Sequence, residues 1–203
     1  MAKLFKPKMP KIGVKGHWSS MKFSENILQD ALIRHVLGLT YLQMADIGEV
    51  FEITEKFKSG TEWIDAWSQM AITLEKRADE SNSNATKESA YLRASTYWRV
   101  SLMYFNSTDD ERLAEYSQNS LDCYHKYLEV SDIDATYVEL PYENTFMPAH
   151  FYKSPVAGDK APLMILTPGR DTFAEDTAWI YRQALKRGIH CLVYDGPGQG
   201  FAL

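Results

Sequence analysis

Residues 162–172 read PLMILTPGRDT, and residues 188–200 read GIHCLVYDGPGQG. In each stretch a short apolar run leads directly into a loop that contains glycine. The residues between them, about 175–187, have a helical pattern, and Gly188 stands where a helix C-terminus favours a positive φ. Strand, helix and strand in this order form a βαβ unit, which predicts a parallel pair with a right-handed crossover. We expect Leu163–Leu166, a wholly apolar run, to be buried on both faces of the sheet.

Two further strands are predicted upstream of this unit, at residues 136–140 and 146–152, because β-favouring residues alternate between turn signals there. Residues 143–144, Glu-Asn, suit a hairpin turn between these strands. We expect Pro141 to end the first strand. Because proline has no N–H to donate to a ladder, Pro148 predicts that the second strand lies at or near the sheet edge.

Before residue 133 the chain has helical periodicity instead. We expect an interrupted pair of helices over residues 25–57, with the break near Gly48. Apolar residues at three- and four-residue intervals predict three more helices, and two of these have capping-box spacing at their starts. The first of the three begins at Ser59, with Glu62 three residues on. The second runs over residues 86–105, and the third begins at Thr108, with Glu111 three residues on. The change of pattern predicts an α/β protein with a basic arm at 1–20, a helical domain at 21–131 and an incomplete sheet domain at 133–203.

Composition excludes some classes of function. The chain has 203 residues, of which 45% are hydrophobic and 24% charged, and a net charge of -5 gives no reason to expect a nucleic acid partner. No apolar stretch has the length of a bilayer span, and the start lacks the apolar core of a signal peptide. We therefore expect no membrane partner and a cytoplasmic location. Cys123 and Cys191 lack metal-ligand spacing and are expected to be buried free thiols.

The loops at 167–172 and 195–200 each follow the carboxyl end of a predicted buried strand, where open α/β sheets bind their ligands. Gly169 lets backbone amides come close to a bound group, and such amides can stabilise a developing oxyanion. The alternative is that both loops are tight turns without a ligand, and the residues alone favour neither. A nucleotide site fits less well, because the glycines of 195–200 lack G-x-G-x-x-G spacing and no P-loop sequence is present.

Residues 162–203 resemble the α/β-hydrolases that carry an N-terminal helical cap, a family that includes FrsA-like proteins, bacterial 2,6-dihydroxypseudooxynicotine hydrolase and fungal hydrolases that shorten heptaketide naphthopyrones. The stretch DGPGQG at 195–200 matches the family's loop after a core strand almost letter for letter. Residues 166–176 are similar to the family's apolar strand, Gly-Gly-x-Asp/Glu-Ser loop and acidic pair. Pro168 departs from the pattern, since the family often has glycine there.

Two upstream stretches are similar to the same family. Residues 91–98, YLRASTYW, look like one of its cap helices, and residues 146–149, FMPA, look like its second core strand. The resemblance therefore covers most of residues 45–203 and implies a helical cap followed by the first strands of the hydrolase sheet.

The resemblance also implies a chemistry. Gly169, Arg170 and Asp171 match the family's oxyanion loop position by position. Because Pro168 has no N–H, the Arg170 amide is the implied oxyanion donor. The implied enzyme is a serine hydrolase without a metal or organic cofactor. It would cleave an ester, or a carbon–carbon bond next to a ketone, in a small aromatic or polyketide-like substrate.

The nucleophile of this family is the serine of a Gly-x-Ser-x-Gly elbow, followed along the chain by an acid and a histidine. No such elbow occurs in this sequence, and its five histidines precede the place where the elbow belongs. We therefore expect an N-terminal part of the hydrolase that is inactive alone. Its expected partners are the missing C-terminal half, continuous or as a separate chain, or another copy of itself. The alternative is a non-catalytic binding or scaffold protein derived from a hydrolase.

Three side chains of the helical part are candidate substrate contacts: Trp67, Arg93 and Tyr97. An aromatic stripe at helical spacing usually belongs to a core, but part of it should face the cleft above the sheet in a cap domain. Arg93, in the middle of an aromatic helix, is either paired internally or aimed at a polar group of the substrate. The sequence leaves both interpretations open.

Overall fold

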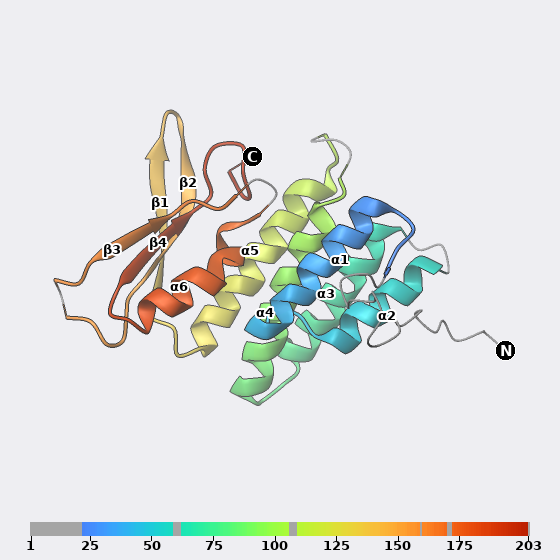
Figure 1. Ribbon diagram of the computed structural model, residues 1–203, viewed down its shortest axis with the longest axis horizontal. Helices are drawn as coiled ribbons and strands as arrows, with labels where there is room; N and C mark the ends of the chain where they lie inside the picture. Colours follow the sequence, from blue (N-terminus) through green and yellow to red (C-terminus); the bar gives the residue numbers. More distant parts are fainter. Residues whose placement is uncertain (1–21, 59–61, 106–108, 159, 170–171, 203) are drawn as a thin grey trace, which may run out of the picture.

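The computed structural model describes residues 22–58, 62–105, 109–158, 160–169 and 172–202. The helices of the N-terminal part gather on one side of a small sheet that is formed by the C-terminal part (Figure 1). The expected order of a helical region followed by a β-rich region is confirmed.

The helical region is built around α4, which is buried around most of its circumference because α3 and α5 both pack along it. α1 and α2 cover the outer side of this group (Figure 1). The bounds are α1 (Ile27–Leu39), η2 (Thr40–Leu42), α2 (Ile47–Lys58), α3 (Trp63–Asp79), α4 (Asn84–Leu102) and α5 (Arg112–Val130).

The starts of α3 and α5 differ from the predicted ones. Each helix begins one residue after a glutamate, Glu62 or Glu111, that is the N-cap and makes no side-chain capping hydrogen bond. A capping box requires the glutamate three residues inside the helix. The predicted boxes are therefore wrong, and their other members, Ser59 and Thr108, lie outside the described residues.

The break between α1 and α2 lies before Gly48, not at it. Gln43 takes a left-handed conformation (φ 62°), which ends η2. Asp46 then accepts hydrogen bonds from the backbone amides of Gly48 (2.8 Å) and Glu49 (3.1 Å) through its Oδ1 atom. This local capping starts α2, so Gly48 lies in its first turn.

The aromatic stripe predicted for the helices forms their core. Trp63 and Trp67 of α3 contact each other with ring centroids 5.4 Å apart, and Trp67 contacts Tyr97 of α4 at 5.5 Å. The indole of Trp63 also donates to the carbonyl oxygen of Val100 (2.9 Å). These three large aromatic side chains therefore hold α3 against α4.

The sheet has four strands among the described residues, in the order β1-β2-β4-β3. β1 and β2 form the predicted antiparallel hairpin, in which Tyr142 pairs with Thr145 and the turn residue Glu143 has a φ of 48°. β1 does not end at Pro141 as predicted, because an edge strand can contain proline. The bounds are β1 (Ala135–Tyr142), β2 (Thr145–Tyr152), β3 (Leu163–Leu166) and β4 (His190–Tyr194).

Pro148 does not place β2 at the sheet edge, since β2 lies between β1 and β4. The β2–β4 ladder begins at the next residue, where Ala149 pairs with Tyr194. Pro148 stands just beyond, and its carbonyl oxygen still accepts from the amide of Asp195 (3.0 Å). The missing N–H therefore removes only the outermost bond of the ladder, which is why an internal strand tolerates it.

β3 and β4 pair in parallel, as the βαβ pattern predicts. The connection consists of η3 (Ala174–Thr177) and α6 (Ala178–Leu185), and it ends at Gly188, whose φ is 79°. The amide of Gly188 donates to the carbonyl oxygen of Leu185 (3.2 Å). The predicted helix is thus confirmed, with a first turn that is 3-10 rather than α-helical.

β3 lies at the edge of the sheet, and only one of its faces is covered. Met164 and Leu166 pack against the core, whereas Leu163 is 49% and Ile165 is 61% exposed. The prediction that this strand is buried on both faces is therefore wrong for the part of the chain that the structure describes. An edge strand of this kind can pair with a further strand, and its exposed apolar face can be covered by another element.

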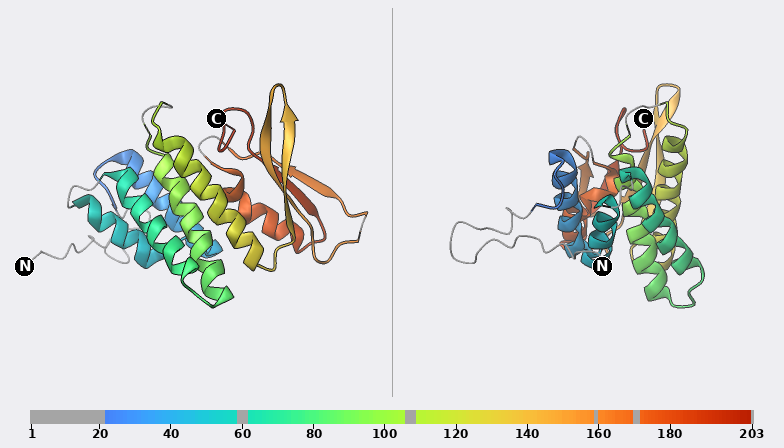
Figure 2. Two further views of the ribbon diagram at one scale, coloured as in Figure 1. Left: turned by 180° about the vertical axis from the view of Figure 1, so that it is seen from behind. Right: turned by 90° about the vertical axis from the view of Figure 1, so that its right-hand side faces the viewer.

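Three tyrosines join the helices to the sheet. The hydroxyl of Tyr124 on α5 lies 2.7 Å from that of Tyr152 on β2 and 3.0 Å from that of Tyr181 on α6. The rings of Tyr152 and Tyr181 stack with centroids 4.2 Å apart. α5 and α6 accordingly lie side by side against the sheet (Figure 2). Cys123 and Cys191 are buried free thiols, as predicted.

Within the described residues, no helix has the length and apolar character needed to cross a membrane.

Candidate functional site

The two loops singled out in the sequence meet at the carboxyl edge of the parallel strands. The hydroxyl of Thr167, just after β3, donates to that of Tyr194 at the end of β4 (2.9 Å). The side-chain amide of Gln199 makes a long hydrogen bond of 3.5 Å to the carbonyl oxygen of Pro168. The loop after β4 therefore reaches back to the loop after β3.

Asp195 is the main link between these loops. Its carboxylate is buried and accepts from the amide of Ala174 at the start of η3 (2.8 Å) and from that of Phe201 in the glycine-rich loop (3.1 Å). Burial raises the pKa of Asp195 to about 6, although these two amides favour its charged form. Gly198 and Gly200 have φ values of 74° and 50°, which allow the loop to fold back onto this carboxylate.

The predicted oxyanion loop is described only in part. Gly169 is exposed, and its carbonyl oxygen accepts from the amide (3.3 Å) and the hydroxyl (2.7 Å) of Thr172. Arg170 and Asp171 lie outside the described residues. Beyond this loop, the amide of Phe173 donates to the carboxylate of Asp176 (3.1 Å). The predicted oxyanion role of these residues remains a prediction.

A cluster of buried charges lies at η3, which follows this loop. Arg99 of α4 and Asp176 of η3 form an ion pair (3.3 Å), with side chains only 1% and 4% exposed. Glu175 is buried next to them, and its Oε1 atom lies 3.7 Å from Nδ1 of His150 on β2. Burial raises the pKa of Glu175 to about 8 and lowers that of His150 to about 3, so both side chains are neutral near pH 7.

A cavity of about 510 Å³ lies beside the glycine-rich loop, between the first half of α5 and the β1–β2 hairpin. This volume is in the range of small-molecule sites. Gly169 and Thr167 do not line it. Its apolar lining consists mainly of Leu113, Leu121, Tyr137, Phe146 and Phe201.

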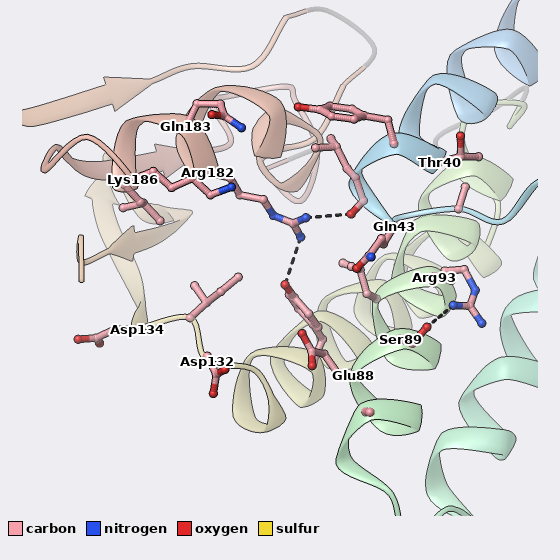
Figure 3. A pocket seen from close by; sticks show the side chains of 18 of the residues that line it. Thr40, Gln43, Glu88, Ser89, Arg93, Asp132, Asp134, Arg182, Gln183 and Lys186 are labelled. Carbon is pink, nitrogen blue, oxygen red and sulfur yellow. Dashed lines mark hydrogen bonds between the residues drawn. The ribbon is translucent and has the colours of Figure 1, made fainter. Parts of the chain in front are cut away.

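A larger cavity of about 940 Å³ lies at the opposite, amino edge of the parallel strands. Arg182 of α6 crosses it and donates to the carbonyl oxygen of Leu42 (2.8 Å) and to the hydroxyl of Tyr127 (3.1 Å) (Figure 3). Acidic and basic side chains both line it, including Glu88 and Lys186. We assign the candidate site to the smaller cavity, because open α/β sheets bind ligands at the carboxyl ends of their strands.

The candidate residues from the helices lie away from the smaller cavity. Trp67 and Tyr97 are fully buried in the helical core, and the hydroxyl of Tyr97 donates to Glu49 (2.9 Å). Arg93 is paired internally, since its Nε donates to the same Glu49 carboxylate at 2.8 Å, and it lies at the margin of the larger cavity. Of the two interpretations of Arg93, internal pairing is thus observed. Contact of these residues with a substrate stays a prediction.

Sequence reasoning missed Arg99, and it did not assign to Asp176 and Asp195 their role of holding the site together. One sequence signal could have found Arg99. It follows Ser95 by four residues and Thr96 by three, so all three lie on one face of the helix, and Arg99 donates to both hydroxyls. Among the described residues, no group of three or more histidine, cysteine, aspartate or glutamate side chains has a geometry that could hold a metal ion.

The family model described as esterase FrsA-like matches residues 45–203. Alpha/beta hydrolase xenA of Xenoacremonium sinensis is 29% identical over 194 residues, which cover 89% of this chain and 45% of that protein. 20-hydroxy-prefusarin hydrolase FUS2 of Gibberella moniliformis is 29% identical over 183 residues, which cover 83% of this chain and 43% of that protein. The chain thus spans less than half the length of these relatives.

The fold is also found in a solved structure. The crystal structure of the 2,6-dihydroxy-pseudo-oxynicotine hydrolase superposes with a TM-score of 0.64 at 21% sequence identity, over 81% of this chain and 46% of that one. The helical region and the small mixed sheet therefore correspond to a part of an α/β-hydrolase. Since the family model also covers most of its residues, the chain belongs to the FrsA-like family of α/β-hydrolases.

Proposed function

We propose that this chain is the N-terminal part of a serine hydrolase whose substrate carbonyl is received at the carboxyl edge of β3 and β4. The observation that supports this most is the double hydrogen bond of Asp195 to the amides of Ala174 and Phe201. These two bonds fix the start of η3 beside the glycine-rich loop. Donors that are fixed before the reaction stabilise an oxyanion without reorganisation.

In this proposal the loop at 169–171 supplies the oxyanion donor. The amide of Arg170 donates to the substrate oxygen, because Pro168 has no N–H and Gly169 leaves room for the approach. Asp171 matches the acidic position of the family's Gly-Gly-x-Asp/Glu-Ser loop. A serine hydroxyl attacks the carbonyl carbon, and a histidine takes its proton and passes it to the leaving group. Water then hydrolyses the acyl-enzyme. Residues 1–203 contain no Gly-x-Ser-x-Gly, so the proposal assigns the serine to another segment or chain.

The substrate class we propose is an aromatic or polyketide-like ester or ketone. The lining of the cavity beside the loop includes the aromatic side chains of Tyr137, Phe146 and Phe201. One relative of this chain is named 20-hydroxy-prefusarin hydrolase. Trp67, Arg93 and Tyr97 remain proposed contacts, which require that the helical region rearranges when a substrate binds.

The test is labelling with a fluorophosphonate probe, which reacts with activated serines. We expect the full product of the gene to be labelled and to hydrolyse p-nitrophenyl butyrate, whereas residues 1–203 alone should do neither. Asp195→Asn should slow both reactions, because an amide cannot accept from both loops as a carboxylate does. Absence of labelling in the full product would favour the non-catalytic scaffold instead.

A further inference from the structure

Among the described residues of α4, only Arg99 forms a buried ion pair with η3. Its guanidinium is held inside α4 by Ser95 (Nη1 to Oγ, 2.7 Å) and Thr96 (Nη2 to Oγ1, 3.2 Å). From this position Nη2 also donates to Oδ1 of Asp176 (3.3 Å). Two hydroxyls one helical turn back thus aim the arginine at η3.

Asp176 passes this contact on to the backbone. While Oδ1 accepts from Arg99, Oδ2 accepts from the amide of Phe173 (3.1 Å). The next amide, that of Ala174, is bound by Asp195. Two consecutive amides at the start of η3 are therefore each held by a buried carboxylate, one of which is oriented by the helical region.

The charge balance supports the same connection. Arg99 faces Asp176 and Glu175 of η3, the carboxyl of Asp195 lies in the same interior, and His150 completes the cluster from β2. Burial opposes the charge of Arg99, but these carboxyl groups outweigh it and raise its pKa. Arg99 therefore stays charged, and Asp176 accepts its hydrogen bond.

We propose that Arg99 is a positioning residue that couples the helical region to the catalytic edge, by orienting Asp176 so that residues 173–177 stay fixed beside the glycine-rich loop. This inference rests on the proposed function. It assigns to α4 a role in the reaction although α4 does not touch the substrate oxygen. The salt bridge is then a specific element of the site rather than a general contact between layers.

The experiment compares three substitutions in the full gene product: Arg99→Met, Arg99→Lys and Asp176→Asn. An asparagine has one acceptor oxygen, so it can serve either Arg99 or the Phe173 amide but not both. Arg182→Met is the matched control, since Arg182 is a partly buried arginine that joins α6 to the helices, at the opposite edge of the strands. The readouts are kcat and KM for p-nitrophenyl butyrate per fluorophosphonate-titrated site, and hydrogen exchange of the peptide covering 172–177.

We expect Arg99→Met and Asp176→Asn to lower kcat roughly 10- to 100-fold with KM within about 2-fold, because a donor displaced by a fraction of an ångström acts mainly on the transition state. Exchange at 172–177 should rise in the same variants, and Arg99→Lys should recover part of kcat. Arg182→Met should reduce the titratable fraction without changing kcat per site.

Two results distinguish a failure of this inference from a failure of the proposed function. If wild-type protein is labelled but Arg99→Met and Asp176→Asn keep their kcat per site and their exchange, Arg99 is a structural residue only. If wild-type protein is neither labelled nor active, the proposed function fails, and with it the catalytic consequence of Arg99. Should Arg99→Met not fold, Asp176→Asn decides, since it keeps the size of the side chain.

Discussion

The carboxylate of Asp195 occupies the space that a side chain on Gly200 would need. A methyl group built on Gly200 would overlap the Asp195 carboxyl group, and the backbone there has a φ of 50°, which disfavours any other residue. The first and last letters of DGPGQG are thus explained by one contact. The loop closes onto the aspartate that ties it to the segment before α6, and only glycine permits that closure.

The first prediction concerns this contact. Gly200→Ala should displace the Asp195 carboxylate and lower the free energy of unfolding by about 2–3 kcal/mol, since backbone strain and a lost buried acceptor both act. Gly198→Ala should cost less, about 1–2 kcal/mol, because its φ is also positive but no atom lies within 4 Å of the added methyl. Denaturant unfolding of the purified variants measures both changes.

Gly38→Ala is the control for that series. Gly38 lies within α1 and has open space around it, so alanine should stabilise the protein by about 0.5–1 kcal/mol through helix propensity. If Gly200→Ala were as harmless as Gly38→Ala, the packing of Asp195 against the loop would not exist in solution.

The second prediction concerns pH and Glu175. Burial raises the pKa of Glu175 to about 8, so the folded protein keeps this proton between pH 4.5 and 8 while the unfolded chain loses it. The free energy of unfolding must therefore fall as pH rises through this window. Asp195, with a pKa of about 6, acts in the same direction at lower pH, and His150, with a pKa of about 3, acts in the opposite direction up to about pH 6.5.

Between pH 6.5 and 8 Glu175 is the only member of the cluster that still contributes. One proton changes stability by at most about 1.4 kcal/mol per pH unit, so the loss across this interval is up to about 2 kcal/mol. Glu175→Gln removes the titrating group and should abolish the decline. A wild-type stability that rises or stays constant from pH 6.5 to 8 would contradict the assignment of a neutral Glu175.

The third prediction concerns the tyrosine cluster between helices and sheet. Tyr124→Phe removes the hydroxyl that both Tyr152 and Tyr181 contact, and we expect a loss of about 1–2 kcal/mol in the free energy of unfolding. Tyr116→Phe on the same helix is the control and should change stability by less than about 0.5 kcal/mol, because the Tyr116 hydroxyl makes no hydrogen bond to a described residue. Equal effects of the two substitutions would exclude a specific role for the cluster.

Patterns that depend on neighbouring residues predicted the fold well. The alternation and turn signals at 136–152 gave the hairpin, and the apolar runs around a helix gave the parallel pair. Predictions that depend on distant partners were wrong. Pro148 signals an edge only if its missing N–H falls within a ladder, and the ladder between β2 and β4 starts one residue later, at Ala149. The apolar run at 163–166 signals two covered faces, but only one face has a covering layer among the described residues.

The candidate site was predictable in position but not in composition. Glycine-containing loops after two apolar strands located the carboxyl edge, because parallel strands bring those ends together. The side chains that hold the edge come from elsewhere: Arg99 is more than 70 residues upstream of Asp176 in the chain. A pairing across such a separation leaves no local signal, since the sequence of α4 alone shows an arginine among aromatic residues and not what it faces.

The last prediction separates the two roles that the sequence allows for Arg93. Its pair with Glu49 is partly buried, so a double-mutant cycle of Arg93→Met and Glu49→Gln should give a coupling energy of about 1–2 kcal/mol in denaturant unfolding. The exposed pair of Lys76 and Glu80, at 3.8 Å, should give less than about 0.5 kcal/mol in the same measurement. If Arg93 instead contacts the substrate, Arg93→Met should raise KM of the full gene product while Glu49→Gln leaves KM unchanged. A coupling energy near zero together with that split would reassign Arg93 from the helical core to the substrate.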